Sequence, residues 1–279
     1  MKLFVRQLTV MDFSYLHPVR GLVGESWYLD VELSGGLDEQ GMVLDFGEVK
    51  RTVKQLVDEA FDHRLLAPAD HPALSLGNGT LRFELAHGGR IVHRGPEEAV
   101  RLIAHHEVTP RSVADAIATL LRTRLPANVH RLKLHLHPEP EEGAFYHYSH
   151  GLKGHCGNCQ RIAHGHRSRI EILRDGRRAP DLEARWAERL RDGYIGTQGD
   201  LDAITRHGDR THFRFAYQAG QGRFELELPA ERCYLIDAES TVENIARHIR
   251  LRLEHEHPGA RFQVRAFEGI GKGAVSETP

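Results

Sequence analysis

Apolar and polar residues alternate in several stretches of the chain, as they do in strands with one buried face. In the first half these stretches are residues 4–8, 27–33, 80–85, 91–93 and 132–136. In the second half they are residues 170–173, 212–217, 223–228 and 262–267. Glycine pairs separate the middle stretches of each half, Gly88-Gly89 in the first and Gly220 with Gly222 in the second, which predicts two hairpins.

Other stretches have a helical period and begin at typical helix caps. Asp45 is followed three residues on by Glu48, Thr109 directly precedes Pro110, and Ser240-Thr241 opens a third segment. A further helix is expected over Leu182–Leu190, with Trp186 on its apolar face. The apolar faces of the capped helices are Val49, Val53, Leu56 and Val57, then Val113, Ile117, Leu120 and Leu121, then Ile245, Ile249 and Leu253.

The same order of elements occurs twice at nearly constant spacing. Corresponding pairs are His17 with His150, Thr109 with Thr241, and Glu139 with Glu268. We therefore expect a tandem duplication of a strand-strand-helix-helix-strand-strand unit, each copy carrying an added hairpin. The proline- and acid-rich stretch 138–143 predicts a boundary between domains 1–140 and 141–279.

Composition narrows the protein class. The formal net charge is −2, so the sequence does not show the excess of basic residues that is typical of proteins that bind nucleic acid or a membrane surface. The sequence has no apolar run near the ~20 residues that span a bilayer, and residues 1–7 do not resemble a signal peptide. Three cysteines in 279 residues argue against a disulfide framework. These features predict a soluble, cytoplasmic protein.

Histidines at metal-ligand spacing stand in the second half. His164 and His166 are two residues apart, so on a strand both point to the same face, and His150 is expected on the neighbouring strand. Three imidazoles fill three corners of a tetrahedron and leave the fourth to water or substrate, the arrangement of catalytic zinc. The alternative is a polar strand that exposes its histidines to solvent.

Two further groups are candidates for proton transfer. Cys159 lies five residues before His164, and a thiol beside a zinc ion ionises readily enough to act as a base. Cys156 completes a Cys-x-x-Cys pair, which leaves a structural zinc or a redox pair as alternatives. Asp62-His63 has the form of an acid–base pair, although such a dipeptide is also common as a surface charge at a helix end.

Together these segments resemble the family of 6-pyruvoyl-tetrahydropterin and 6-carboxytetrahydropterin synthases. The motifs of that family are divided between the two halves. The first half has Phe13-Ser14-Tyr15-Leu16-His17, Gly41-Met42-Val43-Leu44-Asp45-Phe46 with Lys50, and Asp62-His63. The second has His150, Cys156 and Cys159, His164-Gly165-His166, Thr241-Val242-Glu243-Asn244 and Glu268.

Each half also departs from the family pattern. In the first half the His-Gly-His pair has become Val23-Gly24-Glu25, and Arg111 stands where the family has glutamate. In the second half residues 191–198 contain no Asp-His. The complementary losses suggest one site assembled between the two domains, with a vestigial counterpart that contains His17, Glu25 and Glu139.

The resemblance implies an α+β fold of two tandem tunnelling-fold (T-fold) domains, each an antiparallel sheet with helices packed on one face. It implies zinc on His150, His164 and His166, catalysis by Cys159, Asp62 and His63, and substrate binding by Glu268, Thr241 and Glu243. A carboxylate such as Glu268 accepts adjacent N–H groups of a pterin ring in bidentate fashion. Active sites at subunit boundaries imply a homo-oligomer.

The implied reaction is conversion of 7,8-dihydroneopterin triphosphate, a small-molecule pterin. We favour the 6-carboxy-5,6,7,8-tetrahydropterin synthase type, which belongs to queuosine (deazaguanine) biosynthesis. The alternatives are a 6-pyruvoyl-tetrahydropterin synthase, or a pterin-binding descendant without catalysis. Departures at Val23, Glu25 and Arg111 motivate the last of these.

Overall fold

The computed structural model describes residues 1–140 and 142–279. In the first half the strands and helices are β1 (Lys2–His17), β2 (Gly21–Gly35), α1 (Phe46–Ala60), β3 (Leu65–Pro68), β4 (Leu74–Gly77), β5 (Thr80–Glu84), β6 (Arg90–Arg94), β7 (Val100–Ile103), α2 (Pro110–Leu121) and β8 (Val129–His137). The second half has β9 (Ala144–His150), β10 (His164–Arg174), β11 (Arg177–Arg178), α3 (Pro180–Leu190), β12 (Gly193–Thr197), β13 (Leu201–His207), β14 (Arg210–Ala219), β15 (Gly222–Pro229), β16 (Cys233–Ile236), α4 (Val242–Glu256), β17 (Phe262–Phe267) and β18 (Gly273–Glu277).

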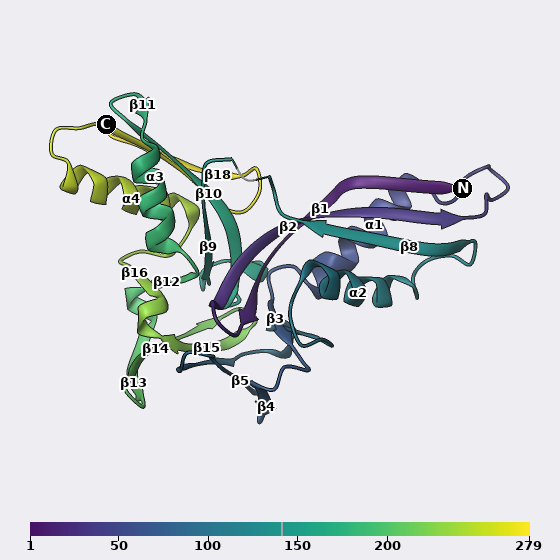
Figure 1. The fold of residues 1–279 in the computed structure, drawn as a ribbon, viewed down its shortest axis with the longest axis horizontal. Coiled ribbons are helices and arrows are strands. Elements are labelled where there is room, and N and C mark those ends of the chain that lie inside the picture. The colour runs from purple at the N-terminus through teal and green to yellow at the C-terminus, as the bar shows by residue number, and fades with distance from the viewer. Residues whose placement is uncertain (141) are drawn as a thin grey trace.

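Each half builds one sheet with two helices on one face. The first sheet is five-stranded in the order β7-β3-β1-β2-β8, and α1 and α2 pack on it through one apolar cluster. The second contains β16-β12-β9-β10-β17-β18, with β11 paired to β10, and is covered by α3 and α4. Figure 1 shows the first sheet at the right and the second at the upper left. The predicted α+β class is confirmed.

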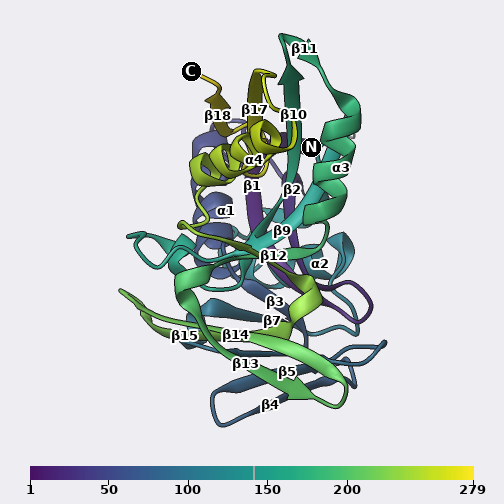
Figure 2. The same cartoon turned by 90° about the vertical axis from the view of Figure 1, so that its left-hand side faces the viewer.

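The two inserted hairpins join into a third sheet. Its order is β13-β14-β15-β6-β5-β4, and the halves meet where β15 pairs with β6 through Leu226 and His93. This sheet lies below the other two in Figures 1 and 2, and its apolar face packs on a third core cluster. The insertions therefore tie the halves together, an arrangement that the sequence left open.

The first two sheets also cross directly at a pair of glycines. A Cβ atom on Gly24 of β2 would lie 1.8 Å from the carbonyl oxygen of Tyr148, and one on Gly165 of β10 would lie 2.7 Å from the Cα of Gly24. The hydroxyls of Ser14 and Ser149 share a hydrogen bond of 2.7 Å at the same place. Backbone therefore meets backbone at this crossing, and only glycine fits there.

Local predictions hold well. Asp45, Thr109 and Thr241 each cap their helix by accepting a backbone N–H three residues on. The predicted repeat is present in both halves, but short strands that the prediction lacked lie between the two helices of each half, β3 and β7 in the first and β12 and β16 in the second. One strand, β8, follows α2, whereas β17 and β18 follow α4. The predicted division between residues 140 and 141 falls at Glu141, outside the described residues, so it stays a prediction. Within residues 1–140 and 142–279, none of the helices has the length and apolar character needed to cross a membrane.

Candidate metal centre and composite active site

Three buried imidazoles converge at the end of the β9–β10 pair. His164 is the cross-strand partner of His150, and His166 lies on the same face of β10 two residues further on. Their side chains are at most 1% exposed, and ring centroids are 4.4 Å apart for His150 and His164 and 5.3 Å apart for His150 and His166. One nitrogen from each ring lies within 4.8 Å of the others, so these rings form a candidate metal group.

Backbone carbonyls fix the orientation of two of these rings. Nδ1–H of His150 donates to the carbonyl oxygen of Ser240 at 2.9 Å, and Nδ1–H of His164 donates to that of Arg161 at 2.8 Å. The Nε2 atoms of both rings and of His166 are buried without a hydrogen-bond partner among the described residues. Burial holds the pKa of His150 and His164 well below the usual range, so both rings are neutral. Neutral rings with free, convergent Nε2 atoms fit a zinc ion.

The third ring is oriented by a carboxylate from the other half. Asp12 Oδ1, on β1, lies 3.3 Å from Nδ1 of His166 and accepts a hydrogen bond of 2.5 Å from the Ser26 hydroxyl. Its other oxygen lies 3.3 Å from Nζ of Lys272. Burial alone would raise the pKa of Asp12, but its interactions with His166 and Lys272 and its hydrogen bond from Ser26 hold that pKa below its usual range. Sequence reasoning missed Asp12, although a charged residue between the core residues Met11 and Phe13 was a signal.

Asp62 and His63 reach this centre from the first half of the same chain. Oδ2 of Asp62 lies 2.5 Å from Nδ1 of His63, and its Oδ1 accepts the backbone N–H of Asp12 at 2.8 Å. The backbone N–H of His63 in turn donates to the Asp12 carbonyl at 2.7 Å. His63 has a φ of 52°, a conformation that side-chain-bearing residues rarely adopt and that these contacts hold in place. Its ring centroid is 5.2 Å from that of His164.

Cys159 lies between this pair and the metal group. Its Sγ and one nitrogen each of His63 and His164 lie within 4.8 Å of one another. Burial opposes charge on His63, but its hydrogen bonds and electrostatic interactions with Asp62 and Cys159 raise its pKa to about 10. Cys156 is exposed, whereas Cys159 is partly buried. The geometry therefore brings Cys159 together with Asp62 and His63, as the sequence suggested.

The inserted sheet holds the segment that carries Cys159. Tyr217 Oη donates to the carbonyl oxygen of Gln160 at 2.9 Å, and Gln160 Oε1 accepts the backbone N–H of Gln221 at 2.5 Å. Arg161 Nε donates to Gln221 Oε1 at 3.0 Å. The β14–β15 hairpin thus holds Gln160 and Arg161, the two residues that directly follow Cys159. The sequence carried no signal for this role, because the hairpin joins the site only through tertiary packing.

The three residues predicted to bind substrate differ in their placement. Glu268 directly follows β17, and its carboxylate lies 3.8 Å from Nζ of Lys272, the lysine that also contacts Asp12. Thr241 caps α4 and is adjacent to Ser240, the acceptor of His150. Glu243 is exposed on the first turn of α4. Glu268 and Thr241 therefore flank the metal group, and Glu243 faces solvent.

Comparison with known proteins identifies the family. The sequence model described as 6-pyruvoyl tetrahydropterin synthase matches the chain twice, over residues 11–148 and 142–278. The chain belongs to this family. The resemblance drawn from the motifs is confirmed, and the fold is a tandem of two T-fold units.

Individual relatives are distant. A protein of Pyrococcus horikoshii with the provisional name 6-carboxy-5,6,7,8-tetrahydropterin synthase is 22% identical over 134 residues, which are 48% of this chain and 79% of that protein. A protein of Archaeoglobus fulgidus with the same provisional name is 40% identical over 61 residues, 20% of this chain and 52% of that protein. Structures of 6-pyruvoyl tetrahydropterin synthase from Plasmodium falciparum and Plasmodium vivax are 15% and 17% identical, cover 49% and 51% of this chain and 90% and 93% of theirs, and each have a TM-score of 0.39.

The counterpart of the metal centre in the first T-fold unit has changed its chemistry. Val23 pairs with Tyr15 as His164 pairs with His150, so Tyr15 occupies the place of the first ligand. The predicted pairing of His17 with His150 is therefore wrong by two residues. Nδ1 of His17 instead accepts the backbone N–H groups of Val19 and Arg20 at 3.1 Å.

An ion pair takes the place of the thiol and imidazole there. Ser14 pairs with Leu65 and Ser149 with Tyr194, so Asp192 is the counterpart of His63. Asp192 accepts two hydrogen bonds from Arg20, of 2.6 and 2.9 Å, and Arg20 also donates to the hydroxyl of Tyr15 at 3.1 Å. The vestigial site is thus closed by a salt bridge between the two units.

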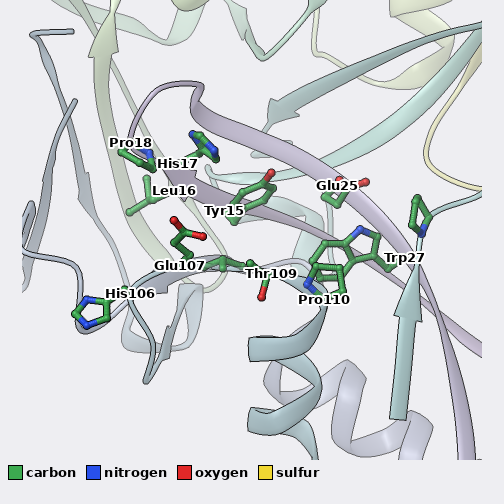
Figure 3. Close-up of a pocket in the computed structure, with 12 residues that line it drawn as sticks. Tyr15, Leu16, His17, Pro18, Glu25, Trp27, His106, Glu107, Thr109 and Pro110 are labelled. Carbon is green, nitrogen blue, oxygen red and sulfur yellow. The ribbon is translucent and has the colours of Figure 1, made fainter. Parts of the chain in front are cut away.

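A pocket of about 380 Å³ remains beside this ion pair, lined by Tyr15, His17, Glu25, Trp27 and Thr109 among others (Figure 3). Pro138 also lines it, whereas the neighbouring Glu139 is paired with Arg169 at 3.3 Å. The predicted vestigial residues His17 and Glu25 therefore share one hollow.

Replacing Glu25 by glutamine is expected to remove a pH dependence of stability. Burial raises the pKa of Glu25 from 4.5 to about 7. Because the folded state binds the proton more tightly, its stabilising contribution is complete below pH 4.5 and is lost as pH rises through about 7. Above that pH the variant should gain roughly 3 kcal/mol over the wild type, measured by urea unfolding at about pH 5 and about pH 8. Glu32→Gln, a partly exposed carboxylate on the same strand, is the control, and an equal gain there would contradict the assignment.

Proposed function

We propose that the chain is a zinc-dependent pterin synthase that acts on 7,8-dihydroneopterin triphosphate, of the 6-carboxy-5,6,7,8-tetrahydropterin synthase type that feeds queuosine biosynthesis. The provisional names of the two curated relatives support this type. The observation that carries the proposal is the meeting of Cys159, Asp62 and His63 beside three convergent imidazoles within one chain. A vestigial binding protein would have no need to keep this arrangement.

The donor set suits a zinc ion held by His150, His164 and His166, whose Nε2 atoms are buried and without a partner among the described residues. When bound, zinc would act as a Lewis acid toward the side-chain hydroxyls of the substrate and acidify the neighbouring C–H bonds. Asp12, Ser240 and Arg161 orient the rings. Such outer contacts hold the ligands in place and raise their affinity for the metal.

Proton transfer falls to the residues that lie beside the three histidines, Cys159 and His63. Cys159 is placed to take a proton from a side-chain carbon of the substrate. His63, whose pKa Asp62 raises through a hydrogen bond, is placed to give a proton to a substrate oxygen. Asp62 touches no substrate atom in this scheme, and it acts by keeping His63 charged and oriented.

The pterin ring is expected to bind at Glu268 and Thr241. The carboxylate of Glu268 would accept the adjacent N–H groups of the ring. Lys272 contacts both this carboxylate and that of Asp12, which lies beside His166. Thr241 would contribute its hydroxyl from the start of α4. Because β7 and β8 form the open edges of the five-stranded sheet, we also propose that the chain assembles into a homo-oligomer.

The decisive experiment incubates the zinc-loaded protein with 7,8-dihydroneopterin triphosphate and identifies the products. Release of triphosphate and acetaldehyde with 6-carboxy-5,6,7,8-tetrahydropterin supports the proposed type. Release of triphosphate with a 6-pyruvoyl product and no acetaldehyde assigns the sister activity. A zinc-loaded protein that binds the substrate without turnover would overturn the enzymatic proposal and leave a pterin-binding descendant.

Cys159→Ala is expected to lower kcat by about 10²- to 10⁴-fold, the usual contribution of a positioned acid or base, while zinc content stays unchanged. Cys156→Ala, which removes an exposed thiol from the same segment, should leave both quantities near wild type. Steady-state kinetics and metal analysis of the two variants provide the comparison. Equal losses in both variants would instead indicate a structural Cys-x-x-Cys zinc site.

A further inference from the structure

A second group of metal-ligating side chains lies on β2 and β8, in the first T-fold unit. Asp30 of β2 is the cross-strand partner of His135, and His137 follows two residues later on the same face of β8. This face is opposite to the one that carries Leu29 and Val31 into the core under α1 and α2. The group therefore belongs to the helix-free face of the sheet and shares no residue with the three-histidine centre.

The distances match a small ion. Oδ2 of Asp30 lies 3.4 Å from Nε2 of His137 and 3.8 Å from Nδ1 of His135, and all three ligand atoms lie within 4.8 Å of one another. Nitrogen and oxygen ligands at ~2.1 Å from a tetrahedral zinc are about 3.4 Å apart. Only a small rotation of His135, whose side chain is 67% exposed, is needed to complete the set.

Two of the three ligands are already oriented by backbone groups. Asp30 Oδ1 accepts the N–H of Gln7 at 2.7 Å, which leaves Oδ2 directed at the histidines. Gln7 has a φ of 48° at an irregularity of β1, so the strand is distorted where it makes this contact. Nδ1–H of His137 donates to the carbonyl oxygen of Pro138 at 3.2 Å, and Nε2 of the same ring lies 3.4 Å from Oδ2 of Asp30.

This orientation directs Nε2 of His137 and Oδ2 of Asp30 at each other, 3.4 Å apart, so that one ion can bind both atoms. A carbonyl partner on the opposite ring nitrogen is the arrangement found behind histidines that bind metal. A hollow of about 400 Å³ adjoins Asp30 and His135 and gives water access to a fourth coordination position.

We propose that Asp30, His135 and His137 bind a second divalent transition-metal ion of the zinc class, completed by water. The ion links the edge strand β8 to β2. Imidazole with carboxylate is a donor set that suits Zn²⁺ and excludes Ca²⁺ and Mg²⁺, which prefer oxygen ligands alone. The site goes beyond the proposed catalytic function, and none of its ligands belongs to that machinery.

Zinc titration of the metal-free full chain, followed by calorimetry, tests the site. The number of ions bound by His135→Ala should be one per chain lower than in the wild type, and pterin turnover should be unchanged. His130→Ala is the matched control, because His130 is an exposed histidine at the start of the same strand and is not part of the Asp30, His135 and His137 group. It should bind as many ions as the wild type.

His137→Ala provides an independent check, and the ion retained at the three-histidine centre reports that each variant is folded. Zn²⁺ should also raise the Tm of the wild type more than that of His135→Ala, because a bound ion stabilises only the folded state. The proposal is overturned if His135→Ala and His137→Ala bind the same number of ions as the wild type. It is also overturned if His130→Ala loses an ion as they do.

Discussion

Replacing His164 by alanine is expected to remove zinc from the three-histidine centre and to lower kcat/KM by at least about a thousandfold. His164 is fully buried, and it belongs both to the group with His63 and Cys159 and to the group with His150 and His166. Without it, two ligands remain, too few to hold a catalytic zinc. Metal analysis after dialysis and kinetics with dihydroneopterin triphosphate measure the two losses.

His255→Ala is the control for this variant, since His255 is an exposed histidine at the end of α4. It should keep the zinc and the turnover of the wild type. Added zinc should not restore the His164 variant at concentrations that saturate the wild type. A variant without zinc that still turned over the substrate would mean that the three histidines serve structure alone.

Local signals predicted the parts of the site that depend on one element. The i, i+2 spacing of His164 and His166 placed both rings on one face of a strand, because side chains alternate there. Asp45, Thr109 and Thr241 marked helix starts, because capping depends on residues within one turn. In the sequence Asp62-His63 lies in the first half and the three candidate zinc ligands lie in the second half. The structure brings the two groups together within one chain.

Contacts between elements carried no such signal. Asp12 lies beside His166 only because the two sheets cross. Tyr217 reaches Gln160 only because an inserted hairpin packs on the segment that carries Cys159. Tyr15, and not the predicted His17, lies opposite Val23. Which residue lies there depends on the register of the strands, and the spacing of a motif does not determine that register. Short strands such as β3 and β12 have four or five residues, too few to show a period.

The crossing of the two sheets leads to the second large effect. Gly24→Ala is expected to lower the free energy of unfolding by more than about 3 kcal/mol and to abolish turnover, although every residue of the chemistry is retained. The added Cβ would lie 1.8 Å from the carbonyl oxygen of Tyr148 and 2.6 Å from the backbone nitrogen of His166. Both obstacles are backbone, so no side-chain rotation relieves them and the sheets must separate.

Separation would move Asp12 and Asp62-His63 away from the zinc ligands, since all three are carried by the first unit. Denaturant unfolding measures the loss of stability, and zinc content and kcat measure the loss of the assembled site. Gly36→Ala is the matched control, because a Cβ there meets nothing within 4 Å just beyond the end of the same strand. If Gly24→Ala matched Gly36→Ala in stability and turnover, the units would not cross as described, and Asp62 and His63 would have to reach the zinc from a neighbouring chain.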